Sequence, residues 1–274
     1  SGFERSMTFL MENGIRTVRF PGIRMIKYDG EDGHLMPLDV EWKFADKSVR
    51  IFTDNTNTAI NPEFETLFLD IYGKVVAYLK QKGWLQHTIV SFIDEPDTSN
   101  PRTLNGTIQL AQLFKKLDPE IKLRVTKWPG ASTSAIYKNF DHFEAHGSHV
   151  QSVSTSRIEE MHADGKKLTL YVNGIEHFQF DGTRVRIWPW IQWTKGFDGS
   201  LSWCRTANWP LYPEIPDRNP WIYHYGSFFG ILGEMMLFYP PTPECPHGPI
   251  NSVRLPLFRQ GLEDCEYLNM LENS

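Results

Sequence analysis

Short apolar runs and longer amphipathic segments alternate along most of this 274-residue chain. Apolar runs of this length predict buried strands, and apolar residues spaced three and four apart predict helices with one buried face. The main strands are expected at 16–20, 50–53, 87–93, 122–127, 143–149, 167–172 and 200–204. Helices are expected at 6–13, from Pro62, from Pro101, and at 131–140, 156–163, 183–196 and 253–271.

Two helix starts carry the same signal. Asn61 precedes Pro62 and Asn100 precedes Pro101. Asparagine is a preferred N-cap, and proline suits the first helical position. The sequence therefore predicts that two long helices begin at these prolines.

About seven strands alternating with helices predict a parallel sheet. The best fit is a (β/α)8 TIM-type barrel whose first strand is missing or hidden in the sequence. The main structural rival is a doubly wound open sheet. It usually carries a glycine-rich phosphate loop, and neither G-x-G-x-x-G nor G-x-x-x-x-G-K-[ST] occurs in this chain.

Three segments depart from this alternation. Residues 21–50 alternate apolar and polar positions between turn signals, which predicts a β-hairpin insertion. Residues 206–251 are rich in Pro, Trp and Tyr and are expected to form a loop-rich cover over the barrel mouth. Residues 253–271 are expected to form a closing helix, and the whole chain, 1–274, is expected to be a single domain.

Composition excludes several classes of protein. With 41% hydrophobic residues, 22% charged residues and a formal charge of -5, the chain is typical of a soluble protein without the basic surface that binds nucleic acid. Its apolar runs are too short for a membrane span. The three cysteines lack a metal-like spacing. Composition sets neither oligomeric state nor compartment.

Two adjacent acids provide the first candidate chemistry. Asp94 and Glu95 follow the strand expected at 87–93 and are followed by Pro96. Barrel enzymes keep their catalytic groups at this end of the strands. Neighbouring residues of a regular strand point to opposite faces, so both acids can share a pocket only if the chain leaves strand geometry. Taken alone, the dipeptide fits a solvated turn better than an active site.

Histidines raise the question of a metal. His142, His146 and His149 are spaced four and three residues apart, as in some zinc sites. On a strand, however, His146 and His149 would point to opposite faces. We therefore expect no metal and no cofactor, and instead expect His146 alone to reach the pocket and bind a substrate hydroxyl.

A wider set of motifs resembles glycoside hydrolase family 123 and its relatives of unassigned function. The resemblance covers about residues 65–271 and is far more specific than the acidic pair. Its motifs are Leu79-Lys-Gln-Lys-Gly-Trp84, Asp94-Glu95-Pro96, Arg186-Ile-Trp-Pro-Trp190, Phe197-Asp-Gly199, Trp203, Asn208-Trp209, Leu237-Phe-Tyr-Pro240, Ser252-Val-Arg254 and Arg259-Gln-Gly-Leu-Glu-Asp264.

The resemblance implies a (β/α)8 catalytic domain and β-N-acetylgalactosaminidase activity on a glycan. In this family the 2-acetamido oxygen of the substrate is the nucleophile. By resemblance, Glu95 is the general acid and then the base, and Asp94 holds the acetamido N–H and stabilises the oxazolinium-like intermediate. Family relatives are bacterial and often exported, which implies a secreted or periplasmic protein.

Further substrate contacts follow from the resemblance and from positions at strand ends. Tyr171 is expected to hydrogen-bond the acetamido carbonyl, Trp203 to form the pocket floor, and Asn208 and Trp209 to meet sugar hydroxyls and the ring. Core or loop packing is the alternative for each.

Two alternatives to this function stay open. One is the same mechanism on another N-acetylated or modified hexosamine, because Thr169 and Leu170 stand where relatives often have Trp. The other is a carbohydrate-binding barrel without turnover. Two adjacent acids at a strand end favour the enzyme, since a binding module has no need for them.

Overall fold

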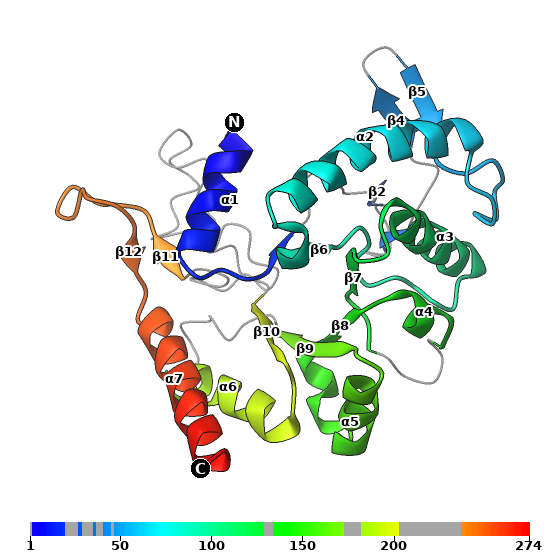
Figure 1. The fold of residues 1–274 in the computed structure, drawn as a ribbon. Helices are drawn as coiled ribbons and strands as arrows, with labels where there is room; N and C mark the ends of the chain where they lie inside the picture. Colours follow the sequence, from blue (N-terminus) through cyan, green and yellow to red (C-terminus); the bar gives the residue numbers. More distant parts are fainter. Residues whose placement is uncertain are drawn as a thin grey trace. The chain divides into compact units, whose positions relative to one another are not determined.

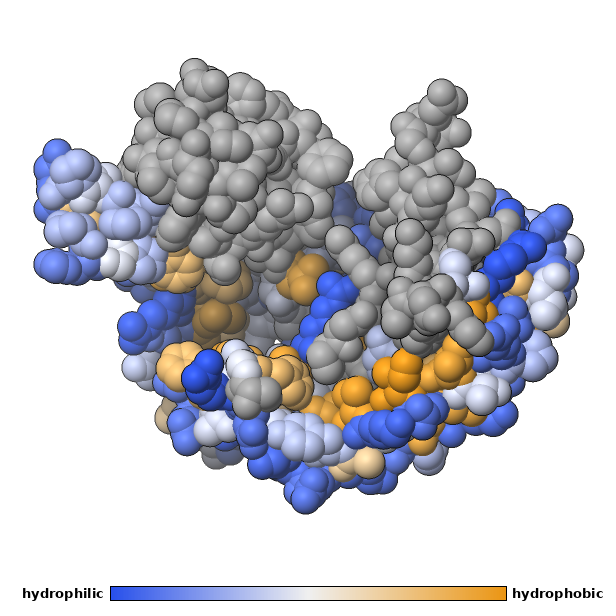
Figure 2. Space-filling view, turned by 90° about the horizontal axis from the view of Figure 1, so that it is seen from above, coloured by the Kyte–Doolittle hydropathy of each residue, from blue (hydrophilic) through white to orange (hydrophobic). Residues whose placement is uncertain are grey.

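The computed structural model describes residues 2–19, 27–28, 35–36, 41–44, 47–128, 134–172, 182–202 and 237–274. The chain divides into two compact units, Ser1–Glu144 and Ala145–Ser274. Figure 1 shows the elements of both, coloured along the sequence. Hydrophilic residues, blue in Figure 2, cover much of the described surface in that view, with apolar residues in orange between them.

The first unit contains four parallel strands in the order β1-β6-β7-β8, together with helices and two small hairpins. Its helices are α1 (Gly2–Glu12), α2 (Pro62–Gln81), the short 3-10 turn η1 (Leu85–His87), α3 (Pro101–Leu117) and α4 (Ser134–Asn139). Its parallel strands are β1 (Val18–Arg19), β6 (Thr88–Val90), β7 (Lys122–Val125) and β8 (His142–His146), the last of which continues into the second unit. The hairpins pair β2 (Lys27–Tyr28) with β3 (Leu35–Met36) and β4 (Glu41–Phe44) with β5 (Lys47–Arg50).

The second unit continues the alternation of strand and helix. Its strands are β9 (Lys167–Val172) and β10 (Gly199–Ser202), paired in parallel, and β11 (Phe238–Tyr239) and β12 (Ile250–Asn251), paired antiparallel. Its helices are η3 (Gly147–Gln151), α5 (Thr155–Ala163), α6 (Gly182–Lys195) and α7 (Arg254–Glu272). No helix in the described ranges is both long and apolar enough to cross a membrane.

Strand order decides between the two folds considered from the sequence. In the first unit the parallel strands follow the order β1-β6-β7-β8, and in the second unit β9 pairs in parallel with β10, so the strands of each unit occur in the sheet in the order they have in the chain. A doubly wound sheet reverses direction at a switch point, and this order has none. An α/β fold with parallel strands in chain order is thus present in the described residues and is consistent with a TIM-type barrel, while a complete (β/α)8 barrel and a single domain stay predictions.

Both predicted N-caps are confirmed. The Asn61 side-chain oxygen accepts the backbone N–H of Glu63 at 3.0 Å, and that of Asn100 accepts the N–H of Arg102 at 3.0 Å. Each satisfies a donor that the first helical turn leaves unpaired. The helices α2 and α3 therefore begin where the sequence predicts.

The strand predicted at 50–53 is wrong. Arg50 ends β5, and Phe52 forms only an isolated antiparallel bridge with Ile60. The chain turns because the carboxylate of Asp54 accepts the backbone N–H groups of Thr56 at 2.8 Å and of Ala59 at 3.0 Å. The hydrogen bonds that Asp54 accepts thus favour a tight turn over a longer strand in this segment.

Aromatic side chains form the core between the helices and strands of the first unit. Phe114 of α3 lies 5.1 Å from Phe68 of α2 and 5.3 Å from Phe92, which follows β6. Phe92 also stacks on Phe140 at 5.8 Å. These buried rings hold α2 and α3 against the chain that leads to Asp94.

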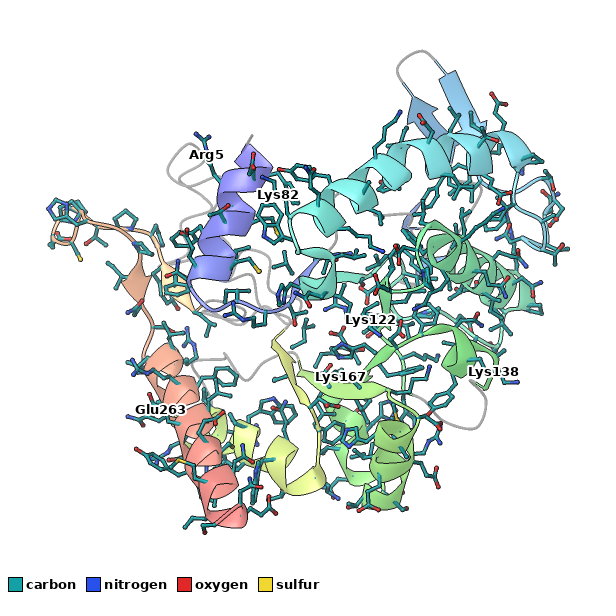
Figure 3. All side chains as sticks on the ribbon, viewed as in Figure 1. Arg5, Lys82, Lys122, Lys138, Lys167 and Glu263 are labelled. Carbon is teal, nitrogen blue, oxygen red and sulfur yellow. The ribbon has the colours of Figure 1, made fainter. Side chains whose placement is uncertain are left out.

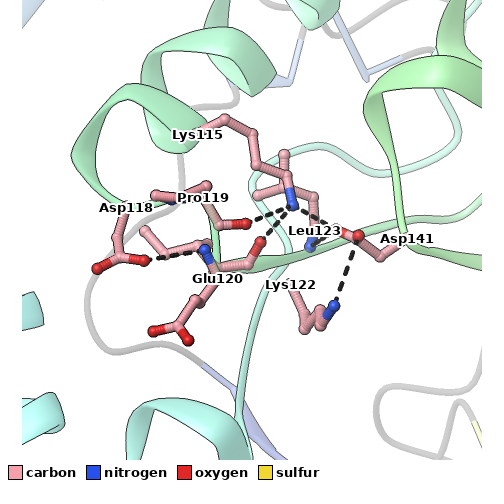
Figure 4. Close-up of polar contacts among 8 residues, drawn as sticks. Lys115, Asp118, Pro119, Glu120, Lys122, Leu123 and Asp141 are labelled. Atoms are coloured by element: carbon pink, nitrogen blue, oxygen red, sulfur yellow. Dashed lines mark hydrogen bonds and ion pairs between the residues drawn. The ribbon is translucent and has the colours of Figure 1, made fainter.

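In each unit, an aspartate directly before one strand accepts a backbone hydrogen bond from the neighbouring strand. Asp141, just before β8, accepts the backbone N–H of Leu123 in β7 at 2.8 Å and the Lys115 ammonium at 2.9 Å (Figure 4). In the second unit, Asp198 accepts the N–H of Leu168 in β9 at 2.8 Å. Each aspartate thus links the beginnings of two neighbouring parallel strands and favours their observed register.

A salt bridge joins α1 to the residue that follows the end of α2. Lys82, labelled in Figure 3, lies 2.6 Å from the Glu4 carboxylate of α1. Both side chains are more than a third exposed, so solvent weakens the attraction and its contribution to stability is small.

Helices α6 and α7 lie side by side (Figure 1) with little space between their backbones. A Cβ atom added at Gly261 would overlap the carbonyl oxygen of Arg186 and lie 3.1 Å from Cγ of Pro189. The Arg186 guanidinium binds both carboxylate oxygens of Asp264, at 2.8 and 3.0 Å. Close packing here requires glycine.

Gly261→Ala should therefore lower the free energy of unfolding by about 1–3 kcal/mol, because backbone cannot yield to the methyl group. Gly73→Ala is the matched control, since a Cβ at this α2 position meets nothing within 4 Å. It should raise stability by up to about 1 kcal/mol through helix propensity. Urea denaturation of both variants measures this, and a Gly261→Ala protein as stable as wild type would contradict the close packing.

Candidate active site

Asp94 and Glu95 lie beyond the carboxyl end of β6. Thr88–Val90 are buried, and Ser91, Phe92 and Ile93 stay buried after the strand has ended. Asp94 is half-buried and Glu95 is exposed. The chain thus brings two carboxylates from the core to the surface within two residues.

Glu95 has a left-handed backbone, with φ of 40°. This conformation is rare outside glycine, costs about 1–3 kcal/mol, and persists where the surrounding structure imposes it. The departure from strand geometry that the acidic pair requires is therefore present at Glu95. Such strain is common at functional sites.

The residues after Glu95 hold this loop in place. Pro96 is buried, and Asp97 accepts the backbone N–H of Ser99 at 2.9 Å and its hydroxyl at 2.6 Å. These hydrogen bonds hold the pKa of Asp97 below its usual range. Asp97 is thus an ionised turn residue and a poor proton donor.

Charged residues gather on one face of the first unit's sheet. Arg124 of β7 pairs in register with His142 of β8. Glu144 lies two residues after His142 and therefore points to the same face of the sheet as His142 and Arg124. Arg19 pairs with Ile89, and Ile89 pairs with Lys122, so these residues share one face. Arg124 lies two residues after Lys122 and therefore points to the same face as Arg19. The opposite face carries apolar side chains, among them Phe143, which stacks on Tyr137 of α4.

Arg124 and Glu144 form a buried ion pair on neighbouring strands. Their Nη1 and Oε1 atoms lie 2.9 Å apart, and the Glu144 side chain is 3% exposed. The pKa of Glu144 is raised to about 7, chiefly because burial disfavours its charge; Arg124 and Arg19 lower it, and the negative charge of Asp94 adds to the rise. Of the two candidate catalytic acids, Asp94 is thus the one whose charge acts on Glu144.

Sequence reasoning missed Glu144. A signal was present, because Arg124 interrupts Leu123 and Val125, and Glu144 interrupts Phe143 and Ala145, in two otherwise buried runs. Single charged residues at the same place in adjacent buried strands indicate a pair across the sheet, since a lone buried charge is costly.

His146 and Tyr171 lie together in the second unit. The ring of His146, the last residue of β8, lies 5.1 Å from that of Tyr171 with an interplanar angle of 70°. Nδ1 of His146 lies 3.2 Å from the backbone N–H of Ser148 and 2.7 Å from the Ser148 hydroxyl, which fixes the orientation of the ring. Two predicted substrate contacts thus meet each other, and their roles toward a substrate stay predictions.

Other predicted sites have different outcomes. Trp203, Asn208 and Trp209 lie outside the described residues. His149 lies in the η3 turn and not on a strand with His146, as β8 ends earlier than expected. Within the part of the chain that the structure describes, no group of three His, Cys, Asp or Glu could hold a metal ion.

Comparison with known families decides what this chain is. The sequence model of the glycoside hydrolase 123 catalytic domain matches residues 1–271. The chain belongs to glycoside hydrolase family 123. The predicted resemblance is confirmed, over a longer stretch than the motifs indicated. Membership in family 123 supports a glycosidase, with Asp94 and Glu95 inside the matched domain.

Solved structures agree with this membership at the level of the fold. The chain is similar to a family 123 glycoside hydrolase from Clostridium perfringens, described for glycolipid glycan hydrolysis, with 16% identity and a TM-score of 0.60. The match covers 84% of this chain and 38% of that one, so this chain spans well under half of that protein's length.

Two further structures are more distant. A family 39 β-xylosidase from Caulobacter crescentus has a TM-score of 0.39 at 14% identity, covering 73% of this chain and 57% of that one. A putative glycerophosphoryl diester phosphodiesterase from Silicibacter pomeroyi has a TM-score of 0.30 at 11% identity, covering 50% and 41%. Neither likeness bears on function. Comparison with curated proteins finds no match.

Proposed function

We propose that this chain is the catalytic domain of a retaining exo-glycosidase that releases β-linked N-acetylgalactosamine by substrate-assisted catalysis. The observation that carries the proposal is the Asp94–Glu95 pair at the end of β6, with Glu95 in a left-handed conformation, inside a matched family 123 catalytic domain. The glycan substrate is its partner, and the chemistry requires no cofactor.

In the first step, the acetamido oxygen of the substrate attacks the anomeric carbon and the glycosidic bond breaks. Glu95 donates its proton to the departing oxygen. The acetamido group becomes an oxazolinium ion, whose N–H donates a hydrogen bond to the Asp94 carboxylate and whose positive charge that carboxylate stabilises.

In the second step, water attacks the anomeric carbon from the face that the leaving group vacated. Glu95, now ionised, takes the proton of the water, and the bond from the anomeric carbon to the acetamido oxygen breaks. Two inversions give net retention. Exposure of Glu95 suits both tasks, because it must meet the leaving group and then water.

Hydrolysis of a panel of 4-nitrophenyl sugars tests the proposal. Wild type should cleave the β-N-acetylgalactosaminide and leave sugars without a 2-acetamido group intact, and Asp94→Asn should lower kcat by about 10²-fold or more. Asp70→Asn, a matched change at an exposed α2 residue, should have no effect. A wild type that ignores every N-acetylhexosaminide would support the binding-barrel alternative.

Inhibition separates this mechanism from one with a protein nucleophile. A thiazoline fused to the sugar ring mimics the oxazolinium ion and should bind wild type far more tightly than N-acetylgalactosamine does. Asp94→Asn should lose most of this preference. Thiazolines of the glucose and galactose configurations, tested together, would identify activity on another hexosamine.

A further inference from the structure

Arg19 makes a long-range contact at the place where β6 ends. It is the last residue of β1, and Nη2 of its guanidinium donates to the backbone carbonyl of Ser91 at 2.8 Å. The two residues are 72 positions apart in the sequence. Arg19 is exposed, whereas Ser91 is 6% exposed, so a side chain at the surface binds a carbonyl that belongs to a buried segment.

The Ser91 carbonyl lies beyond the hydrogen-bond ladder of the sheet. Toward β1 the described pairing of β6 ends at Ile89, and toward β7 it ends at Val90. The chain nevertheless stays buried through Ser91 and the next two residues. A buried carbonyl that leaves a ladder needs another donor, and a charged donor forms a stronger hydrogen bond than a neutral one. Arg19 thus supplies at Ser91 what a neighbouring strand supplies to the residues before it.

A fixed Ser91 determines how the chain reaches the acidic pair. Only Phe92 and Ile93 separate Ser91 from Asp94, and both side chains are buried. The Phe92 ring stacks on one ring of α3 and on another just before β8. Such packing leaves the backbone little room to adjust, so a displacement at Ser91 reaches the two acids. Glu95 in addition has a left-handed backbone, which persists only where the surrounding structure holds it.

We propose that Arg19 is a positioning residue for Asp94 and Glu95: through the Ser91 carbonyl, it fixes the point at which the chain leaves β6 and thereby the placement of the two carboxylates. It acts through the backbone and does not itself touch the substrate. The role in turnover rests on the proposed function, whereas the restraint on the backbone does not. Displacing a reacting group by about 1 Å can lower a rate by about 10²-fold, so one hydrogen bond at this place is enough for a large effect.

Hydrogen exchange of the protein without substrate tests the restraint. Arg19→Met removes the donor and keeps an unbranched side chain. The backbone amides of residues 92–95 should then exchange about tenfold faster than in wild type, because a hydrogen bond from a charged group is lost. Those of α3 should exchange at the wild-type rate. Exchange in residues 92–95 that equals wild type would overturn the proposal.

Two further variants complete this test. Arg19→Lys keeps a charged donor, and its exchange in residues 92–95 should stay within about threefold of wild type. Arg16→Met is the matched control, because Arg16 also donates to a backbone carbonyl, that of Met11 in α1 at 3.0 Å, and it should leave residues 92–95 unchanged. If Arg19→Met does not fold, Arg19→Gln, whose side chain is too short for the same contact, replaces it. Failure of both to fold would make Arg19 a requirement of the whole fold and would overturn the proposal.

Turnover is measured on the same folded proteins. The kcat of Arg19→Met on a β-N-acetylgalactosaminide should fall by about 10²-fold while KM stays within about twofold of wild type, and Arg19→Lys should restore most of the loss. Arg16→Met should behave as wild type. An unchanged kcat would overturn the role in turnover, and a raised KM beside it would assign Arg19 to substrate binding. Wild type without activity, combined with faster exchange in Arg19→Met, would mean that the proposed function fails while the restraint holds.

Discussion

Glu95→Gln should lower kcat/KM on a β-N-acetylgalactosaminide with a sugar leaving group by about 10²–10⁴-fold, the usual contribution of general acid–base catalysis. An alkoxide leaves poorly without a proton, and glutamine has none to give. The substitution keeps the size of the side chain, and it keeps the left-handed backbone at this position under the same strain. KM should change little, because the lost interaction belongs to the transition state.

The leaving group distinguishes a general acid from a residue that binds sugar. 4-Nitrophenolate departs without protonation, so the first step on a 4-nitrophenyl substrate should be much less sensitive to Glu95→Gln. A loss that is the same for aryl and sugar leaving groups would contradict the acid role. Glu120→Gln is the matched control, since Glu120 is an exposed acid paired with Lys80 at 3.0 Å, and it should behave as wild type.

Features fixed by neighbouring residues were predictable from the sequence. The starts of α2 and α3 follow from Asn61 and Asn100 with their prolines, and β9 has the predicted bounds, 167–172. The short run at 50–53 is apolar enough for a strand. The Asp54 carboxylate, however, accepts hydrogen bonds from nearby backbone N–H groups, and these bonds favour a turn. Pattern alone does not distinguish these outcomes in a segment of four residues.

The candidate site was predictable in part. An acidic pair directly after a buried run is visible in the sequence, and the need for a break in strand geometry follows from the alternation of side chains. The left-handed backbone of Glu95 depends on packing around buried Pro96, which no local pattern specifies. Glu144 depends on residues from three other segments, so its coupling to Asp94 emerges only when the strands are in register.

The same buried acid should make stability depend on pH. The pKa of Glu144 rises from 4.5 to about 7 on folding, so the folded state favours the protonated form. A raised pKa contributes stability that is fully present below the unfolded value and is lost as pH rises through the folded value. The window is therefore pH 4.5 to about 7, and the loss across it is about 3 kcal/mol.

Urea denaturation of wild type and Glu144→Gln at several pH values between 5 and 8 measures this loss. Other groups that titrate in the same range contribute equally to both proteins. The difference between the two unfolding free energies isolates Glu144, and it should move by about 3 kcal/mol in favour of Gln as pH rises. Glu120→Gln should show no such trend, because its carboxylate is exposed in both states. A difference between wild type and Glu144→Gln that stays constant from pH 5 to 8 would mean that Glu144 is ionised throughout, and Arg124 would then be neutralised in the working enzyme.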